Sequence, residues 1–381
     1  MASIVTKPNT PPATTEGLVP FVDARAARLQ QRLKEENLDA FITFSPANRR
    51  YLTGFDGSFG FALVGAAGDR TFFTDWRYDE QAAAQAPSYT VVRLQKNKDL
   101  LTPLAARLAE LGVKRIGFES DHVTPAWLAD AAAGVTGVEW VPLRRLVEGL
   151  RAIKDEYEVA RLAEAQALAD EVWTHMLTRI VPGVTERQLA VELRHQFELA
   201  GAENYPGIPI VASGWRAALP HGRASNKELV RNEFVLFDFG ALVNGYHSDM
   251  TRTVVLGNAD AKMKEIYALV LEAELAGLEL AQRPGATGRD IDRACRVPIH
   301  RGGYQQYEHG FSVGHGLGLE VHEDPFVSEA YAARLEPGMV ITVEPGIYVP
   351  GFTGVRIEDT VLITEGGGVV LNSSPRDLLE L

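Results

Sequence analysis

The most constraining part of the sequence is a pair of apolar runs at residues 234–255, FVLFDFGALVNGYHSDMTRTVV. The Asn-Gly dipeptide at 244–245 favours a two-residue type I′ turn, so the stretch predicts a β-hairpin. With that turn, Gly240 faces Asp249 across the ladder. Asp238 then lies on the same face, as a diagonal neighbour of Asp249 about 7–8 Å away.

Two carboxylates on one face of this hairpin would lie among Val, Leu and Phe side chains. Such a pair is costly to keep ionised unless a cation lies between the two groups, and a metal ion is the simplest such cation. The alternative is that one aspartate is buried by itself while the other points to solvent beyond a bulge. Asp238 and Asp249 are therefore candidate metal ligands.

Composition limits the class of protein. A chain of 381 residues exceeds one ordinary core and predicts two domains. Hydrophobic content of 46% and charged content of 23% are typical of a globular protein, and no run reaches transmembrane length. The formal charge of −12 disfavours binding to nucleic acid or to an anionic membrane. Cys295 is the only cysteine, which excludes a disulfide framework and suits a reducing cytoplasm.

The chain divides into three parts by pattern. Residues 1–20 contain Pro, Thr and Ser without an apolar core, which predicts a flexible tail rather than a signal peptide. Residues 21–150 alternate short apolar runs with amphipathic ones, which predicts an α/β domain. Residues 151–381 combine long helices with strand pairs. Two polar segments of the first domain, 51–60 and 74–81, are expected to be loops, with substrate contact as a second interpretation.

An internal duplication is visible in the second domain. A long helix predicted over 155–180 is followed by PGVTER at 182–187, and PGATGR recurs at 284–289, in each case before another helix. The second half ends in its own predicted strand pair, 339–344 with 355–362, joined by a Pro- and Gly-rich loop. Two helix-helix-hairpin units are therefore expected, with a site that draws ligands from both.

The second half supplies further candidate ligands. Glu344 and Glu358 are each expected inside an apolar strand, where unpaired carboxylates are rare. Between the hairpins lies a glycine-rich segment at 315–323, HGLGLEVHE. The combined ligand set is Asp238, Asp249, His315, Glu344 and Glu358. Four carboxylates and one imidazole are too acidic for one divalent ion and suit two, with Mn²⁺, Co²⁺, Zn²⁺ and Fe²⁺ all compatible.

This ligand set indicates hydrolase chemistry. Two ions about 3.5–4 Å apart lower the pKa of a shared water and polarise the carbonyl or phosphoryl oxygen under attack. A ligating glutamate can take the water's proton, and neutral histidines can stabilise the oxyanion or protonate a leaving nitrogen. His221 and His322 are candidates for that work; the alternative is that each is a structural histidine. Arg356 would hold a ligating or a substrate carboxylate, or simply form an ion pair beside the ligands.

With these motifs assembled, the chain resembles the pita-bread metallopeptidases, in the branch that contains aminopeptidase P and prolidase. The resemblance covers nearly the whole chain. It rests on FDFG at 237–240, SDMTRT at 248–253, HGLGLEVHE at 315–323, VEPGIY at 343–348 and VRIED at 355–359. It implies an α/β creatinase-like N-terminal domain followed by an α+β pita-bread catalytic domain with internal duplication.

The resemblance also implies residue roles. The five ligands would hold two divalent ions, Mn²⁺ first, with Co²⁺ or Zn²⁺ as alternatives. Asp249 and Glu358 would bridge the ions, and Glu344 would also be the general base. The remaining matches to the family's catalytic and substrate-binding positions are His221, His322, Tyr348 and Arg356.

The implied activity is that of an Xaa-Pro aminopeptidase acting on peptides with proline second, in a cytoplasmic homodimer. YLTGF at 51–55 and DWRY at 75–78 look closer to aminopeptidases P than to prolidases. An Xaa-Pro bond is a tertiary amide without an N–H, so it needs a dedicated site. The alternatives are an Xaa-Pro dipeptidase, a non-catalytic binding module on the same fold, and non-peptide hydrolysis or lyase chemistry.

One position departs from the family pattern. Relatives usually have a histidine four residues before the ligand histidine, and here Phe311 stands at that place. Either the segment is shifted and His309 substitutes for the missing histidine, or the substrate contacts on that side of the site differ.

Overall fold

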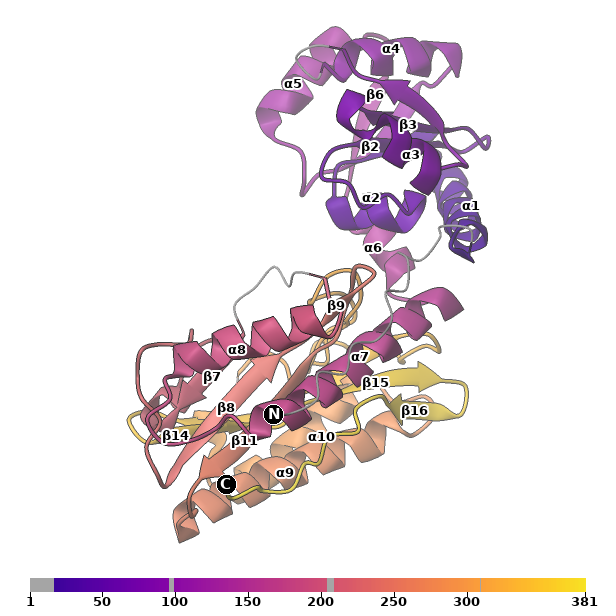
Figure 1. Cartoon of the computed structure of the whole chain (residues 1–381). Helices are drawn as coiled ribbons and strands as arrows, with labels where there is room; N and C mark the ends of the chain where they lie inside the picture. Colours follow the sequence, from indigo (N-terminus) through magenta and orange to yellow (C-terminus); the bar gives the residue numbers. More distant parts are fainter. Residues whose placement is uncertain (1–16, 96–98, 204–208, 309) are drawn as a thin grey trace. The chain divides into compact units, whose positions relative to one another are not determined.

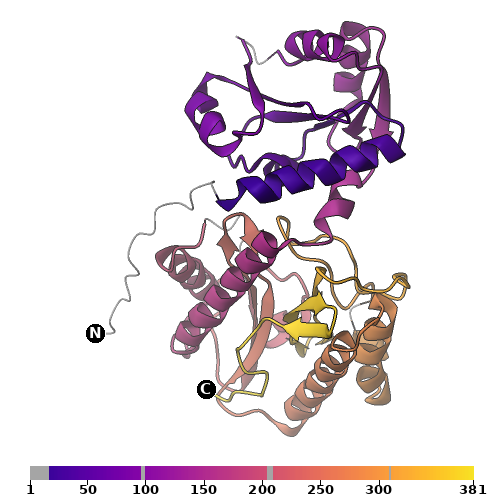
Figure 2. The same cartoon turned by 90° about the vertical axis from the view of Figure 1, so that its right-hand side faces the viewer.

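The computed structural model describes residues 17–95, 99–203, 209–308 and 310–381. These residues form two compact units that divide between Arg151 and Ala152 (Figures 1 and 2). Residues 1–16 of the expected tail lie outside the described residues, and the first helix already begins at Val19. None of the described helices is both long and apolar enough to cross a membrane.

The N-terminal unit is built on one mixed sheet, with strand order β4-β3-β2-β1-β5-β6. Its strands are β1 (Ala40–Thr43), β2 (Phe61–Gly65), β3 (Arg70–Thr74), β4 (Thr90–Arg93), β5 (Arg115–Glu119) and β6 (Glu139–Leu143). Its helices are α1 (Val19–Glu35), α2 (Pro46–Thr53), η2 (Trp76–Tyr78), α3 (Asp79–Gln85), α4 (Leu101–Glu110), α5 (Pro125–Gly134) and α6 (Leu146–Arg151). Each apolar run expected to be a strand is one, which confirms the α/β class.

The two segments expected to be loops are partly helical, so that prediction was only partly right. The first three residues of 51–60 close α2, and 74–81 contains η2 and the start of α3. Polar side chains cap these helices. The side chain of Ser45 accepts from the backbone N–H three residues later, and that of Asp75 from the one two residues later. Gly54, at φ 78°, then ends α2.

The C-terminal unit contains two three-stranded sheets, β11-β8-β7 and β12-β15-β16, and two short hairpins, β9-β10 and β13-β14. Its helices are α7 (Glu156–Leu177), α8 (Glu186–Leu199), η4 (Gly214–Ala218), α9 (Ala261–Ala281), α10 (Gly288–Arg301) and η5 (Gln305–Tyr307). The strands of the first half are β7 (Ile210–Ser213), β8 (Glu233–Phe239), β9 (Leu242–Val243), β10 (Tyr246–His247) and β11 (Met250–Leu256). Those of the second half are β12 (Val340–Val343), β13 (Gly346–Val349), β14 (Thr353–Arg356), β15 (Asp359–Thr364) and β16 (Gly367–Val370).

The predicted first hairpin is confirmed in its register. The two turn residues have φ values of 49° and 80°, both positive as a type I′ turn requires. Val243 pairs with Tyr246, and after a short break the same register continues into β8 and β11, where Asp238 lies opposite Thr251. At the break, a Cβ on Gly240 would lie 1.8 Å from the carbonyl oxygen of Ser248, so only glycine fits there.

The predicted second strand pair is only partly right. Strand β12 does pair with β15, but the intervening residues 346–356 form a hairpin of their own rather than a loop. Pro345 cannot donate a ladder hydrogen bond, and β12 ends two residues before it. Glu344 therefore follows β12, and Glu358 precedes β15. The expectation that each glutamate lies inside a strand was wrong. Arg356 belongs to the inserted hairpin rather than to the strand that follows Glu358.

The duplicated motifs have duplicated structures. Thr185 caps α8 and Thr287 caps α10, each through a reciprocal capping box. The glycine two residues before each threonine has a positive φ, 85° and 78°. Figure 2 shows α9 and α10 of the second half packed side by side. In both halves a short hairpin interrupts the central strand pair, so the two halves bring their site residues to corresponding breaks.

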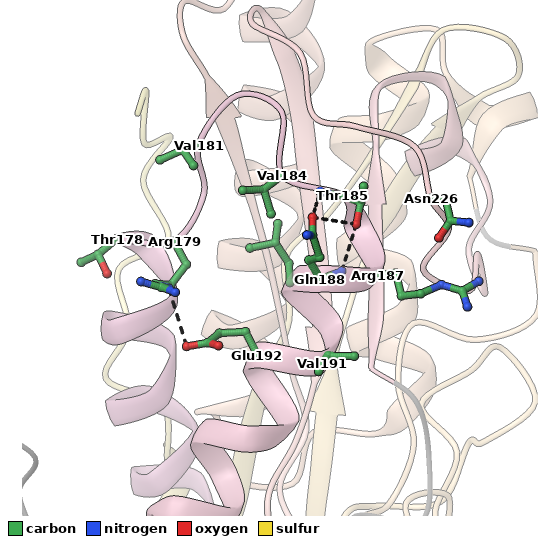
Figure 3. A pocket seen from close by; sticks show the side chains of 11 residues that line it. Thr178, Arg179, Val181, Val184, Thr185, Arg187, Gln188, Val191, Glu192 and Asn226 are labelled. Atoms are coloured by element: carbon green, nitrogen blue, oxygen red, sulfur yellow. Dashed lines mark hydrogen bonds and ion pairs between the residues drawn. The ribbon is translucent and has the colours of Figure 1, made fainter.

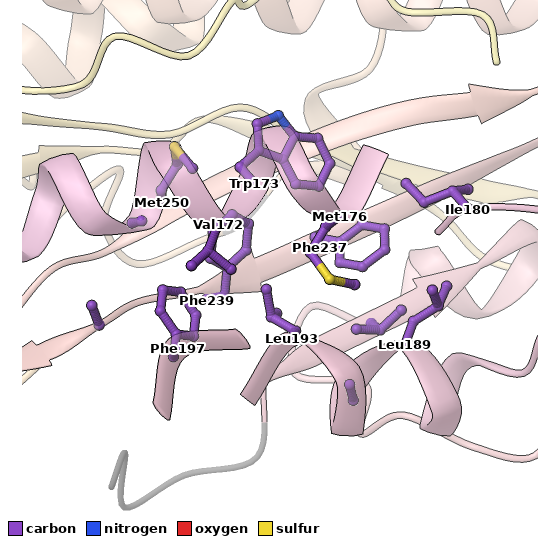
Figure 4. Packing of buried hydrophobic residues seen from close by; sticks show 14 of the residues in the cluster. Val172, Trp173, Met176, Ile180, Leu189, Leu193, Phe197, Phe237, Phe239 and Met250 are labelled. Atoms are coloured by element: carbon purple, nitrogen blue, oxygen red, sulfur yellow. The ribbon is translucent and has the colours of Figure 1, made fainter. Parts of the chain in front are cut away.

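A tight aromatic core fixes the position of β8. Trp173 of α7 packs against Phe237 and Phe239, with ring centroids 5.3 and 5.7 Å apart (Figure 4). Leu193 and Phe197 of α8 belong to the same buried cluster. Because successive strand residues point to opposite faces, the residue between the two phenylalanines, Asp238, points away from this core.

Candidate metal centre

The candidate metal ligands and the candidate catalytic and substrate-binding residues all line one cavity of about 340 Å³ in the C-terminal unit. They are His221, Asp238, Asp249, His315, His322, Glu344, Tyr348, Arg356 and Glu358. The aspartates come from the first half of the duplication, and His315 and the glutamates from the second, as a site between the two halves predicts. The remaining lining residues are Pro209, Ile210, Pro220, Ser312, Val321 and Phe326.

Three of the five predicted ligands form a compact cluster. Asp249, His315 and Glu358 each offer one ligand atom, and these atoms lie within 4.8 Å of one another. All three residues are at least nine-tenths buried. Glu344 lies at the edge of this cluster, with its Oε1 3.4 Å from Nε2 of His315. Oxygen-rich groups with one imidazole are thus gathered at one buried point.

Asp238 and Arg356 form an ion pair at the side of the cluster. The guanidinium is also hydrogen-bonded through Nε to the hydroxyl of Thr251 at 3.0 Å and through Nη1 to the hydroxyl of Tyr348 at 2.6 Å. Nη1 further donates to the carbonyl of Pro220 at 3.3 Å. Arg356 therefore holds residues from four separate segments around the cavity.

Sequence reasoning missed the role of Thr251. Its hydroxyl donates to Oε2 of Glu358 at 2.7 Å, so it joins the first hairpin to a candidate ligand of the second half. A signal was available, because Thr251 is two residues after Asp249 and therefore on the same face of the strand pair.

Burial and mutual repulsion dominate the electrostatics. Burial, followed by the charges of Asp238 and Glu344, raises the pKa of Asp249 well above its usual range. Burial, followed by the charge of Asp249, does the same to the pKa of Glu358. Oε1 of Glu358 is buried and has no hydrogen-bond partner among the described residues. A buried oxygen without a donor, beside carboxylates that repel one another, fits the donor set of a divalent cation.

Two histidines of the cavity, His315 and His322, are held in their neutral form. Burial lowers the pKa of His315, and burial together with the neighbouring His315 lowers that of His322. The two rings lie 4.3 Å apart. Nδ1 of His315 lies 3.0 Å from the carbonyl of Gly316, which favours the tautomer with hydrogen on Nδ1. Nε2, which faces the carboxylates, is then the nitrogen with a lone pair for a metal.

The position where relatives usually have a further histidine does not face the cavity. Phe311 is 89% exposed and is not among the lining residues, whereas its neighbour Ser312 is. His309, the suggested substitute, lies outside the described residues. The difference at this position thus falls next to the cavity wall rather than within the ligand cluster.

A larger cavity of about 870 Å³ lies where α7 ends and α8 begins (Figure 3). The residues that line it in the described part of the chain include none of the predicted site residues. Its walls combine valines such as Val181 and Val191 with the ion pair of Arg179 and Glu192, whose atoms are 3.6 Å apart. It lacks a cluster of buried titratable groups, so the smaller cavity is the candidate active site.

Family models match both units of the chain. Metallopeptidase family M24 matches residues 160–365, and the creatinase/prolidase N-terminal domain matches residues 25–153. The chain belongs to metallopeptidase family M24, which confirms the resemblance inferred from the sequence. It is accordingly a metal-dependent hydrolase, and the interpretation as a non-catalytic binding module is set aside.

Individual relatives match over nearly their whole length. "Uncharacterized peptidase YqhT" of Bacillus subtilis is 41% identical over 93% of this chain and 99% of the relative. "Xaa-Pro dipeptidase" of Pyrococcus horikoshii is 33% identical over 94% of this chain and 99% of the relative.

Solved structures of similar proteins confirm the expected fold class, a creatinase-like N-terminal domain followed by a pita-bread domain. An Xaa-Pro dipeptidase from Bacillus anthracis matches with a TM-score of 0.90 and 40% identity, over 94% of this chain and all of that one. An X-Pro aminopeptidase from Thermotoga maritima matches with a TM-score of 0.85 and 34% identity, over 91% and 98% of the two chains.

Proposed function

We propose that this protein hydrolyses the Xaa-Pro bond of dipeptides at a centre of two divalent metal ions. The observation that carries the proposal is the convergence of five ligand-type side chains, two histidines, Tyr348 and Arg356 on one cavity of about 340 Å³. The names of the similar proteins favour a dipeptidase over the aminopeptidase that the sequence motifs favoured. The X-Pro aminopeptidase of Thermotoga maritima keeps aminopeptidase activity as the second candidate.

The ligands of the two ions are the five residues expected from the sequence. In this proposal Mn²⁺ is the first choice of metal, and Co²⁺ and Zn²⁺ are the alternatives. When bound, such a pair of ions supplies a water of lowered pKa and a Lewis acid for the substrate carbonyl. The ligands are Asp238, Asp249, His315, Glu344 and Glu358.

Glu344 is the proposed general base. Its side chain is 23% exposed, whereas Glu358 is almost fully buried, so Glu344 is the glutamate that can reach a water in the cavity. The hydroxyl of Thr342 donates to its Oε1 at 3.4 Å and holds it beside His315. A carboxylate held at the mouth of the cluster can accept the proton of the attacking water.

His322 and His221 are the proposed groups on the substrate side. The lowered pKa of His322 keeps its ring neutral near pH 7, so the ring can donate one N–H to the oxygen of the scissile carbonyl. The leaving nitrogen of proline must also gain a proton, because it departs as a secondary amine. His221, which also lines the cavity, is the proposed partner in that transfer.

Arg356 and Tyr348 are proposed to orient these groups. The guanidinium of Arg356 contacts Asp238, Thr251 and the Tyr348 hydroxyl. Its proposed role is to hold the ligand Asp238 and the phenol of Tyr348 in place. Burial raises the pKa of Tyr348, which keeps the phenol protonated and able to donate to substrate.

Three finer features are part of the proposal and rest on the sequence alone. A homodimer would help to close a site for short peptides, and a cytoplasmic location suits a protein with a single cysteine, Cys295. The net charge of −12 argues against nucleic acid as a partner.

The test is hydrolysis of an Xaa-Pro dipeptide and an Xaa-Pro-Xaa tripeptide by metal-stripped protein, before and after addition of Mn²⁺, Co²⁺ or Zn²⁺. An Xaa-Ala dipeptide with the same first residue is the matched control for the proline requirement. Metal-restored cleavage of Xaa-Pro alone supports the dipeptidase. Cleavage of the tripeptide at the same bond favours the aminopeptidase instead, and no proline-dependent cleavage with any metal refutes both.

A further inference from the structure

A buried ion pair lies behind the active-site cavity, between Lys154 and Glu323. Nζ of Lys154 is 3.3 Å from Oε2 of Glu323, and the two side chains are 0% and 5% exposed. Neither residue is among those that line the cavity. Burying two charges costs free energy, and a buried ion pair does not by itself add stability. The role of this pair is therefore inferred from the groups that contact it.

The carboxylate of Glu323 lies at the centre of a tight turn. Gly316 and Glu323 exchange two backbone hydrogen bonds, of 3.0 and 2.8 Å, so the segment between them folds back on itself. Oε1 of Glu323 accepts from the backbone N–H of Glu320 at 3.0 Å, inside that turn. A Cβ on Gly318 would lie 2.6 Å from Oε2, so the carboxylate packs directly on the backbone of the turn.

The two ends of this turn carry two of the histidines that line the cavity. His315 directly precedes Gly316, and His322 directly precedes Glu323, and their rings lie 4.3 Å apart. Any movement of the Glu323 carboxylate changes the turn and therefore the separation of these rings. The turn is thus the local structure that sets the position of one metal-ligand candidate relative to one proton-handling candidate.

Lys154 is itself firmly anchored. It lies just before α7, and its backbone N–H donates to the carbonyl of Gly338 at 2.9 Å, close to the start of β12. A Cβ on Gly338 would lie 3.0 Å from the carbonyl oxygen of Lys154, so the two backbones are in close contact. The backbone of Lys154 is therefore held in place, and its ammonium group contacts the carboxylate at the centre of the turn.

We propose that Lys154 is a positioning residue for the active site. Its ammonium neutralises and holds the Glu323 carboxylate, and through the turn it sets the separation of His315 and His322. Without the ammonium, the buried carboxylate would lose this ion pair, so keeping it charged inside the protein would cost more free energy. The part of this inference that concerns His322 rests on the proposed function, whereas the part that concerns His315 rests on metal binding.

The experiment uses the full-length protein and two variants at the pair. Lys154→Met removes the ammonium, and Lys154→Met with Glu323→Gln removes both charges of this pair, so that neither member stays charged without the other. Lys227→Met is the matched control, because it breaks the ion pair of Lys227 and Glu233, whose atoms are 2.7 Å apart and neither of which lines the cavity. The readouts are Co²⁺ titration followed by visible absorption, kcat and KM on an Xaa-Pro dipeptide, and thermal unfolding.

Both Lys154 variants are expected to bind Co²⁺ more weakly and to lose kcat, each by about 10- to 100-fold, as is typical when support for metal ligands is removed. KM should change less than kcat, because the pair does not contact the substrate. The Lys227→Met control should keep wild-type Co²⁺ affinity and kcat even where its unfolding temperature falls. A change in unfolding temperature alone does not count as support.

The proposal is overturned if the double variant folds and keeps both Co²⁺ affinity and kcat within about twofold of wild type. If Lys154→Met by itself does not fold, the double variant decides the question. If the wild-type protein binds Co²⁺ but does not cleave Xaa-Pro bonds, the proposed function fails while the Co²⁺ titrations still test the role of Lys154.

Discussion

The hydroxyl of Thr251 donates a hydrogen bond of 2.7 Å to Oε2 of Glu358, and so links β11 of the first half to the residue that precedes β15 of the second. The same hydroxyl accepts from Nε of Arg356 at 3.0 Å. Because Oε1 of Glu358 has no hydrogen-bond partner among the described residues, this bond is the main constraint on the carboxylate. The orientation of a proposed ligand thus depends on a residue from the other half of the duplication.

Thr251→Val should therefore weaken metal binding. Valine has nearly the same shape but cannot donate, so the buried carboxylate loses its hydrogen bond, at a cost of about 1–3 kcal/mol in unfolding free energy. Affinity for Mn²⁺ should fall by about 10- to 100-fold in calorimetric titration. Thr178→Val at the end of α7 is the control, since its hydroxyl only bonds a local carbonyl. Unchanged Mn²⁺ affinity in Thr251→Val would mean that Glu358 is held by other contacts.

Local turn chemistry explains how much of this site could be predicted from the sequence. An Asn-Gly dipeptide admits one short turn, and that turn determines the register that brings Asp238 and Asp249 to one face. The second strand pair had no such signal. Pro345 ends β12 early, and residues 346–356 form an inserted hairpin, so the positions of the second-half ligands differ from those expected.

Contacts between distant segments could not be predicted in the same way. Lys154 and Glu323 are 169 residues apart, and nothing near Lys154 in the sequence distinguishes it from a surface lysine. Arg356 posed the opposite problem: its place near the ligands was expected, but its bond to Tyr348 requires the fold. Strand periodicity identifies which side chains share a face, whereas the partners of buried charges depend on tertiary packing.

Metal binding should be coupled to proton release. Burial and neighbouring charges raise the pKa values of Asp249 and Glu358, so these carboxyl groups retain protons to higher pH than usual. A metal ligates only the ionised form, so Mn²⁺ affinity should rise as pH increases through the raised pKa values. Titration calorimetry in buffers of different ionisation enthalpy measures the released protons. Asp249→Asn should release fewer protons, and heats that do not depend on the buffer would contradict the coupling.

Glu274 on α9 predicts that the protein loses stability as pH rises. It is fully buried, and both carboxyl oxygens lack hydrogen-bond partners among the described residues. Burial, followed by the charge of Asp359, raises its pKa well above the usual value. Below the pKa of the unfolded chain both states are protonated, and no penalty arises. As pH rises, the unfolded chain ionises first, so the unfolding free energy falls until the folded pKa is reached.

Glu274→Gln removes this penalty without a large change in shape. Its unfolding temperature should exceed that of wild type by an amount that grows as pH rises from about 4 toward the raised pKa of folded Glu274, and the two proteins should be closest at the acid end. Glu272→Gln on the same helix is the control, because Glu272 is about half exposed and paired with Arg301. A constant difference across this pH range would show that Glu274 titrates normally.

Gly240 should be the position in the first hairpin least tolerant of a side chain. It lies at the break between β8 and β9, where a Cβ would be 1.8 Å from the backbone carbonyl of Ser248. Backbone atoms cannot rotate out of the way as a side chain does, so Gly240→Ala must separate the two strands between Asp238 and Asp249. The variant should lose Mn²⁺ affinity and activity together, with a lower unfolding temperature. Gly366→Ala is the matched control, because its nearest atom would be 3.8 Å away, and it should retain all three. Wild-type Mn²⁺ affinity in Gly240→Ala would mean that the spacing of these aspartates does not limit metal binding.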